Sequence, residues 1–239
     1  MPLQKAALIK KTYLAEGTIQ LDFETEASFE FQAGQFISIK VEDNSSSPCI
    51  RGYSIASYPH SDNQNKAFSL CVKLVENGRG SNWLNSLKEG QEIQFLGPNG
   101  KFLFNPNPDS KNILFIATGT GIAPLKTMIE DQLLNKNNQN KFHLLFGVRY
   151  IKEIFYQDVF QKLADKFSNF TYEITISRPE KEDWSGNKGR VTALLENLKI
   201  DTTNTEAYLC GLKYMLTEVT SILESKGLSP DKVHSEQYY

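Results

Sequence analysis

Hydrophobic and polar positions follow two different patterns in the two halves of the chain. In the first half, short runs alternate between apolar and polar side chains, as in residues 36–41 and 68–75, and clusters of Gly, Asn, Ser and Pro separate them. From residue 111 onward, continuous apolar runs typical of buried strands alternate with helix-like segments. We predict a β module over residues 1–104 followed by an α/β module over residues 111–239.

The join between the modules is the segment Asn-Pro-Asn-Pro-Asp-Ser at residues 105–110. Two prolines among small polar residues can continue neither a helix nor a sheet ladder. A chain of 239 residues is long enough for two domains that each bury a core of their own.

One strand-to-helix junction in the second half has the composition of a diphosphate site. Residues 113–117 are apolar and mostly β-branched or aromatic, and residues 124–134 have helix-like composition. The turn between them consists of Thr118, Gly119, Thr120 and Gly121. Without a Cβ, the two glycines let the backbone approach a phosphate, and the helix start offers free N–H groups. The alternative is an ordinary turn, since Pro124 stands where the common dinucleotide pattern has a third Gly or Ala.

The net charge and the spacing of cysteines and histidines argue against several classes of function. The formal net charge is −2, with acidic and basic residues nearly balanced in both halves, so we expect no nucleic-acid partner. Three widely spaced cysteines and three scattered histidines fit neither a disulfide framework nor a metal site. No basic-then-apolar leader and no long apolar run occur, so we expect a cytoplasmic protein that does not enter a membrane.

Residues 51–54 place a cation, an aromatic ring and a hydroxyl close together. On an extended segment, Arg51 and Tyr53 project to one face and Ser54 to the other. Such a set can hold a flavin: the guanidinium pairs with a diphosphate, the ring flanks the isoalloxazine and the serine reaches its edge. The alternative is an ordinary strand with a surface Arg.

A second glycine turn follows the next strand, which carries Val72 and Lys73. It runs through Gly-Arg-Gly to Ser81, where we predict a helix N-cap. Gly80 and the free N–H groups of Ser81 and Asn82 would form a second anion site.

The ends of the other predicted strands bring further polar residues to one crevice. In an open α/β sheet, ligands bind at the carboxyl ends of the strands. The residues at these ends include Thr118, Gly119, Gly147, Arg149, Ser177, Arg178, Cys210 and Gly211. A dinucleotide would span them.

Six motifs in this order resemble the ferredoxin–NADP reductase family of flavoproteins. They are Arg51-x-Tyr53-Ser54, Gly78-x-Gly80-Ser81-x-x-Leu84, Gly97-Pro98-x-Gly100, Gly119-x-Gly121-x-x-Pro124, Cys210-Gly211 and Glu236-x-Tyr238. The resemblance implies an antiparallel Greek-key β-barrel that binds FAD, followed by a five-stranded parallel sheet with flanking helices that binds NAD(P)H.

The resemblance also implies roles for individual residues. Ser54, Cys210 and Glu236 would stand at the site of hydride transfer, with Cys210 beside the nicotinamide. Tyr238 or Tyr239 would stack on the flavin, the alternative being an exposed, frayed terminus.

Cofactor preference stays open from the sequence. Ser177 and Arg178 resemble the pair that holds the 2′-phosphate of NADPH, and an Arg fork suits that dianion. The segment from Trp184 to Val191 looks more like the reductase components of oxygenases, which mostly take NADH. We expect NADPH, with NADH as the alternative.

The resemblance implies an FAD-dependent, monomeric NAD(P)H oxidoreductase that passes electrons to a small carrier protein, ferredoxin or flavodoxin. Arg51 together with the helix start at Ser81 favours FAD over FMN. The enzymatic alternatives are an NADH-dependent flavin reductase and the detached reductase component of an oxygenase. The non-enzymatic alternative is a nucleotide-binding module that senses redox state.

Overall fold

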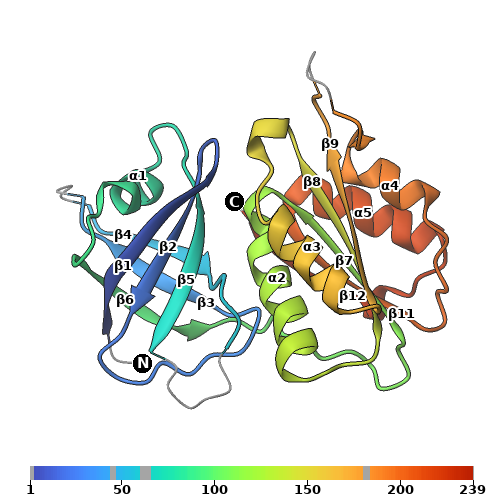
Figure 1. The fold of residues 1–239 in the computed structure, drawn as a ribbon, viewed down its shortest axis with the longest axis horizontal. Helices are drawn as coiled ribbons and strands as arrows, with labels where there is room; N and C mark the ends of the chain where they lie inside the picture. Colours follow the sequence, from blue (N-terminus) through green and yellow to red (C-terminus); the bar gives the residue numbers. More distant parts are fainter. Residues whose placement is uncertain (1–2, 44–46, 60–65, 180–183, 239) are drawn as a thin grey trace.

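Two β-sheets, each with its own core, form two lobes that lie side by side (Figure 1). The computed structural model describes residues 3–43, 47–59, 66–179 and 184–238. The first sheet belongs to the N-terminal half and the second to the C-terminal half, as the change of hydrophobic pattern predicts.

The first lobe is an antiparallel sheet in the order β4-β3-β6-β1-β2-β5. Its elements are β1 (Gln4–Ala15), β2 (Thr18–Glu24), β3 (Phe36–Val41), β4 (Cys49–Ser54), β5 (Ala67–Lys73), α1 (Arg79–Ser86) and β6 (Glu92–Asn99). A bridge between Ile55 and Leu70 joins the two ends of the sheet, which confirms the barrel. Alternate residues point inward, and the rings of Phe29, Phe68 and Phe95 pack with centroids 5.2–5.4 Å apart. Residues 97–99 continue β6.

The second lobe is a parallel sheet in the order β10-β9-β8-β7-β11-β12. Its strands are β7 (Asn112–Thr118), β8 (Lys141–Val148), β9 (Phe170–Ile176), β10 (Asn187–Lys188), β11 (Thr205–Leu212) and β12 (Val233–Tyr238). The five long strands agree in number with the sheet that the resemblance implies, and the two-residue β10 extends the edge beside β9. The fold class is therefore confirmed.

Helices cover both faces of the parallel sheet. They are α2 (Ile122–Glu130), α3 (Gln157–Lys166), α4 (Val191–Asn197) and α5 (Lys213–Ser225). Met128 of α2 and Phe160 of α3 belong to one core cluster, whereas Leu195 of α4 and Val219 of α5 belong to the other. Strand β7 lies in the middle, so both of its faces are buried, and this explains its continuous apolar run.

The segment between the lobes is fixed to the parallel sheet by a buried carboxylate. Glu206, 2% exposed, accepts hydrogen bonds from the Asn107 N–H at 2.6 Å and the Ser110 hydroxyl at 2.8 Å. His234 Nε2 lies 2.8 Å from its other oxygen. Burial opposes ionisation, yet these hydrogen bonds hold the pKa of Glu206 below its ordinary value.

Candidate functional site

A cavity of about 1040 Å³ opens at the carboxyl ends of the parallel strands, beside the barrel. Ten of the residues expected to bind cofactors line it: Lys73, Thr118, Gly119, Thr120, Gly121, Arg149, Ser177, Arg178, Gly211 and Tyr238. Its size is at the upper end of the range for ligand sites, which is roughly 300–1,000 Å³. The cavity is therefore large enough for a dinucleotide.

The turn after β7 is shaped by its two glycines. It is a single 3-10 turn, Gly119–Gly121, and it leads directly into α2. Gly119 has φ +53°, in the left-handed region. A Cβ on Gly121 would lie 2.5 Å from the Cys210 carbonyl oxygen, so a side chain there would collide with β11. No side chain caps either helical start, so their N–H groups can serve an anion, as the sequence predicts.

Three residues from both lobes meet next to this turn. The Ser54 hydroxyl, at the end of β4, donates a hydrogen bond of 3.2 Å to Glu236 Oε2 on β12. Cys210 is the residue of β11 that pairs with Glu236 in the parallel ladder. Tyr238 belongs to the same cluster, because Ser54, Cys210 and Glu236 all affect the ionisation of its phenol. The structure thus brings together Ser54, Cys210 and Glu236, far apart in the sequence.

This cluster is polar, and burial opposes the ionisation of its acidic groups. Burial raises the pKa of Glu236 to about 7, against the opposing effect of the Ser54 hydrogen bond. Burial likewise raises the pKa of the Cys210 thiol and of the Tyr238 phenol well above their ordinary values. At neutral pH, Cys210 and Tyr238 are protonated and Glu236 is close to its midpoint. A thiol in this state is a compact packing group and a poor nucleophile.

Arg51 and Tyr53 lie on one face of β4, against the start of α1. A Cβ on Gly80 would approach the Tyr53 hydroxyl at 2.7 Å and Arg51 Cγ at 3.0 Å, so only glycine leaves room for both side chains. Burial raises the pKa of Tyr53 to about 12, so its phenol stays protonated. Arg51 is exposed and donates to the Ile50 carbonyl oxygen at 2.9 Å. A cation, an aromatic ring and a helix start therefore meet at one place.

The prediction that Ser81 caps a helix was wrong. Helix α1 begins at Arg79, and Ser81 lies inside its first turn, where its hydroxyl accepts from the Val75 N–H at 3.2 Å and donates to the Gly78 carbonyl oxygen at 3.3 Å. The Asn82 N–H is also not free, because it donates to the Gly78 carbonyl oxygen at 3.0 Å. Asn82 instead lines a second cavity of about 480 Å³.

Several expected cofactor contacts are placed elsewhere. Val72 is 1% exposed in the barrel core, and Pro124 is buried in the first turn of α2; neither lines the cavity. Lys73 lines it but also forms an ion pair of 3.0 Å with Glu153 of the second lobe. Although burial acts in the other direction, Lys73 lowers the pKa of Glu153. Tyr239 lies outside the described residues.

At the far end of the cavity, arginine side chains that follow two of the strands supply positive charge. Arg178 Nη1 lies 3.3 Å from the Tyr150 hydroxyl, and the Ser177 hydroxyl donates weakly to the Val148 carbonyl oxygen at 3.4 Å. Arg190 also lines the cavity and pairs with Glu218 at 3.2 Å. Arg190 was not among the predicted site residues; the sequence feature that points to it is the Gly189-Arg190 pair just before α4.

Two of the three histidines are partly exposed and lie on strands beside carboxylates. His143 of β8 faces Glu173 at 3.2 Å, and His234 faces Glu206. His60 lies outside the described residues. Within residues 3–43, 47–59, 66–179 and 184–238, no group of three metal-ligating side chains gathers, and no helix has the length and apolarity needed to span a membrane.

Comparison with known proteins identifies both lobes. Residues 5–104 match the family model of the oxidoreductase FAD-binding domain, and residues 115–221 match that of the oxidoreductase NAD-binding domain. The chain is 32% identical to ferredoxin–NADP reductase B of Sorangium cellulosum over 98% of its own length and 97% of that protein's. This chain belongs to the ferredoxin–NADP reductase family. It is an oxidoreductase with FAD and NAD(P) as cofactors.

The chain is also similar to a longer protein and to two reductases of known structure. The chain is 29% identical, over 91% of its length, to a component of the Na⁺-translocating NADH-quinone reductase of Psychrobacter cryohalolentis, of which it spans 55%. Among solved structures, a ferredoxin–NADP⁺ reductase from Neisseria gonorrhoeae with bound FAD and NADP shares the fold over the whole of both chains, with TM-score 0.86 and 20% identity. An Amycolatopsis cytochrome P450 reductase does so with TM-score 0.86 and 23% identity, over 99% of this chain and 70% of that one.

The residues present fit both cofactors. Gly80, without a side chain, lets the first turn of α1 approach Arg51 and Tyr53 closely, and a guanidinium beside a helix start suits the diphosphate of FAD. The Gly119–Gly121 turn leaves uncapped N–H groups at the cavity, which suits the diphosphate of a nicotinamide dinucleotide. The cluster of Ser54, Cys210 and Glu236 adjoins both places, because Ser54 is on the same strand as Arg51 and Cys210 packs against Gly121.

Proposed function

We propose that this reductase takes a hydride from NADPH and passes electrons to a separate small carrier protein, ferredoxin or flavodoxin. The observation that carries the proposal is the meeting of Ser54 from the barrel with Cys210 and Glu236 from the parallel sheet, next to Tyr238, which lines the cavity. The near full-length similarity to a ferredoxin–NADP reductase supports the choice of carrier.

Bound FAD would supply a ring system that accepts a hydride and releases electrons one at a time. In this proposal, residues 1–104 form the FAD-binding domain and residues 111–239 the NAD(P)H-binding domain. Arg51 and Tyr53, with the helix start at Gly80, hold the flavin cofactor. The Gly119–Gly121 turn, with Thr118 and Thr120 beside it, holds the diphosphate of the nucleotide.

Ser54, Cys210 and Glu236 are the proposed residues of the hydride-transfer site. The Ser54 hydroxyl and the Glu236 carboxyl, 3.2 Å apart, can hold a proton between them, because the raised pKa of about 7 keeps much of the carboxyl protonated. The Cys210 thiol fills the space beside them without adding charge. Tyr238 lines the cavity beside this cluster and is proposed to help exclude water.

At the other end of the cavity, Ser177 and Arg178 are proposed to hold the 2′-phosphate of NADPH. Arg149 and Arg190 line the same wall and add positive charge. Specificity for NADH is the second candidate, and the similarity to proteins named NADH-quinone reductase favours it. We further propose a monomeric, cytoplasmic protein, in keeping with three unpaired, buried cysteines.

Anaerobic turnover with candidate acceptors tests the proposal. The purified protein, saturated with FAD and supplied with NADPH, should reduce ferredoxin or flavodoxin rapidly and gain little from added free flavin. Rapid turnover that needs free FMN or FAD would indicate a flavin reductase, and turnover only with an oxygenase component would indicate its detached reductase. The absence of turnover with every acceptor would contradict the proposed enzyme.

A further inference from the structure

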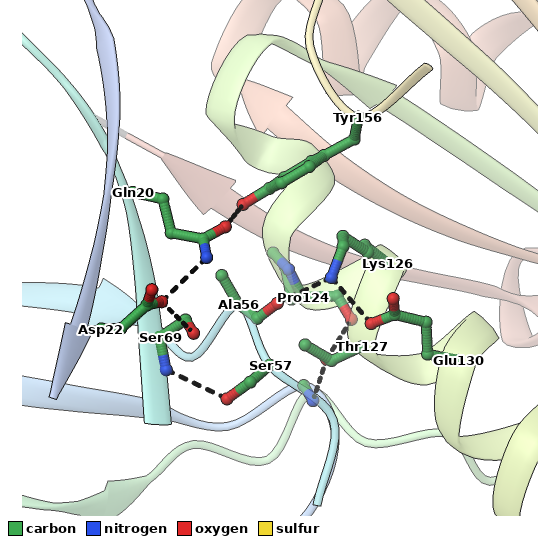
Figure 2. Close-up of polar contacts among 11 residues, drawn as sticks. Gln20, Asp22, Ala56, Ser57, Ser69, Pro124, Lys126, Thr127, Glu130 and Tyr156 are labelled. Carbon is green, nitrogen blue, oxygen red and sulfur yellow. Dashed lines mark hydrogen bonds and ion pairs between the residues drawn. The ribbon is translucent and has the colours of Figure 1, made fainter. Parts of the chain in front are cut away.

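A lysine is buried where the two lobes meet. Lys126 of α2 is 7% exposed, and its amine makes an ion pair of 2.7 Å with Glu130 one turn along the helix. The same amine donates to the Ala56 carbonyl oxygen of the barrel at 3.1 Å. Figure 2 shows this amine between the segment at Ala56 and helix α2. Lys126 thus bonds to both lobes at once.

Tyr156 extends this contact deeper into the barrel. The Lys126 amine lies 4.9 Å from the centre of its ring, and its hydroxyl donates to Gln20 Oε1 at 2.9 Å. Gln20 in turn donates to Asp22 at 2.8 Å, which also accepts from the Ser69 hydroxyl at 2.6 Å (Figure 2).

The backbone at Tyr156 indicates that this side chain is held in place. Tyr156 has φ +58°, in the left-handed region that residues other than glycine rarely adopt. It is 6% exposed and immediately precedes α3. Such a conformation persists only where the surrounding contacts fix it.

Both ends of the Lys126 contact lead to the hydride-transfer site. Ala56 lies just beyond Ser54 on the barrel segment. Lys126 lies little more than one helical turn beyond Gly121, whose Cα packs against the Cys210 carbonyl. The Lys126 contact therefore joins the barrel segment that carries Ser54 to the helix that begins against Cys210.

The Lys126 contact is better suited to fixing the relative position of the two lobes than to holding them together. Removing an ammonium and a carboxylate from water is costly, and apolar side chains would hold two lobes together at least as well. Apolar surfaces, however, can slide over one another, whereas a hydrogen bond to a single carbonyl oxygen fixes both distance and direction.

We propose that Lys126, supported by Tyr156, is a positioning residue for hydride transfer, because it fixes the flavin-binding segment at Ala56 against the helix that begins at the dinucleotide turn. This inference rests on the proposed function. It adds that the geometry of the reacting groups is set from the buried interface between the lobes.

The double variant Lys126→Met/Glu130→Gln tests this proposal, because it removes both charges while keeping side chains of similar length on α2. Glu130→Gln alone keeps the amine and its bond to Ala56. Lys226→Met is the matched control, because its amine donates to the carbonyl oxygens of Glu196 and Leu198 within one lobe. The Tyr156→Phe variant removes a single hydroxyl and serves where the double variant does not fold.

Two measurements distinguish a positioning role of Lys126 from a general loss of stability. In stopped-flow reduction by NADPH, we expect the limiting rate of the double variant to fall by about 10- to 100-fold, since a displacement of about 1 Å can cost roughly 100-fold. The nucleotide Kd should change less than about threefold, and FAD should stay bound. Glu130→Gln and Lys226→Met should keep rates within about threefold of wild type, and Tyr156→Phe should lose about fivefold.

The second readout needs no turnover. The Gly34 N–H of the barrel donates to Thr127 Oγ1 of α2 at 3.1 Å, and both groups are buried, so its hydrogen exchange reports separation of the lobes. Exchange in residues 32–35 should speed up in the double variant, and to a smaller extent in Tyr156→Phe, but not in Lys226→Met.

An unaltered limiting rate in the double variant or in Tyr156→Phe would overturn the proposal, as would slow reduction with unaltered exchange at Gly34. Failure of the proposed function gives a different result: NADPH would not reduce the wild-type protein, while the exchange experiment would still report on the interface.

Discussion

The carboxyl group of Glu236 should make stability depend on pH in a defined direction. Burial between the lobes raises its pKa from the ordinary 4.5 to about 7. When a carboxyl has a higher pKa in the folded than in the unfolded protein, its contribution to stability is complete only at pH values below the pKa of the unfolded state. That stability is lost as the pH rises from 4.5 to about 7, and little more is lost above. Glu236→Gln should remove this dependence, since a glutamine oxygen can still accept from Ser54.

The magnitude follows from the difference between the two pKa values. At about 1.4 kcal/mol per pH unit, a rise from 4.5 to about 7 corresponds to at most about 3 kcal/mol. Glu236 is only half-buried, so solvent screening reduces this to about 1–2 kcal/mol. For a protein of this size, that difference amounts to about 2–8 °C in Tm.

Thermal unfolding of the FAD-saturated protein, measured from pH 4.5 to pH 8.5, tests this reasoning. The Tm of Glu236→Gln should exceed that of wild type by about 2–8 °C above pH 7, and the difference should shrink toward pH 4.5. Glu224→Gln, which alters an exposed carboxylate on α5, is the control and should show no such trend. A difference that is constant with pH, or largest in acid, would refute the assignment of a half-buried carboxyl with a raised pKa.

Three further predictions concern the cavity and the connecting segment. Arg178→Ala should weaken NADPH binding by about 1.5–3 kcal/mol while leaving NADH nearly unchanged, because a charge-assisted bond to the 2′-phosphate is lost; titration with both nucleotides checks this, and equal losses would contradict it. Gly121→Ala should destabilise the protein by about 1–3 kcal/mol and weaken both nucleotides, because its Cβ would meet the Cys210 carbonyl oxygen at 2.5 Å; an unaltered Tm and unaltered titrations would contradict this close approach of the turn to β11. Ser110→Ala should cost about 1–3 kcal/mol in urea unfolding, since it leaves the buried Glu206 short of a donor, whereas the exposed Ser225→Ala should cost little.

Features set by local sequence were predictable. The run at residues 113–117 predicts a central strand because both faces of β7 are buried, and the two glycines after it predict the turn that the structure shows. The start of α1 was not predictable in this way. The helix begins two residues before Ser81, at Arg79, which donates hydrogen bonds of 2.6 and 2.8 Å to Asp43, a tertiary contact that the local sequence does not indicate.

Residues whose roles depend on the other lobe were harder to predict. Glu236 and Tyr238 could have belonged to a frayed terminus, but β12 pairs with β11 and places them beside Ser54. Lys126 looks like a solvent-facing helix residue, and only the packing of α2 against the barrel makes it a buried contact.

The most direct test of the central claim is anaerobic stopped-flow mixing of the FAD-saturated protein with NADPH, followed in the visible absorbance of the bound flavin. We predict loss of the oxidised flavin absorbance within a single turnover, with slower loss in Ser54→Ala and Cys210→Ala, both of which should retain FAD. A protein that binds no FAD, or whose flavin neither NADPH nor NADH reduces, would contradict the claim.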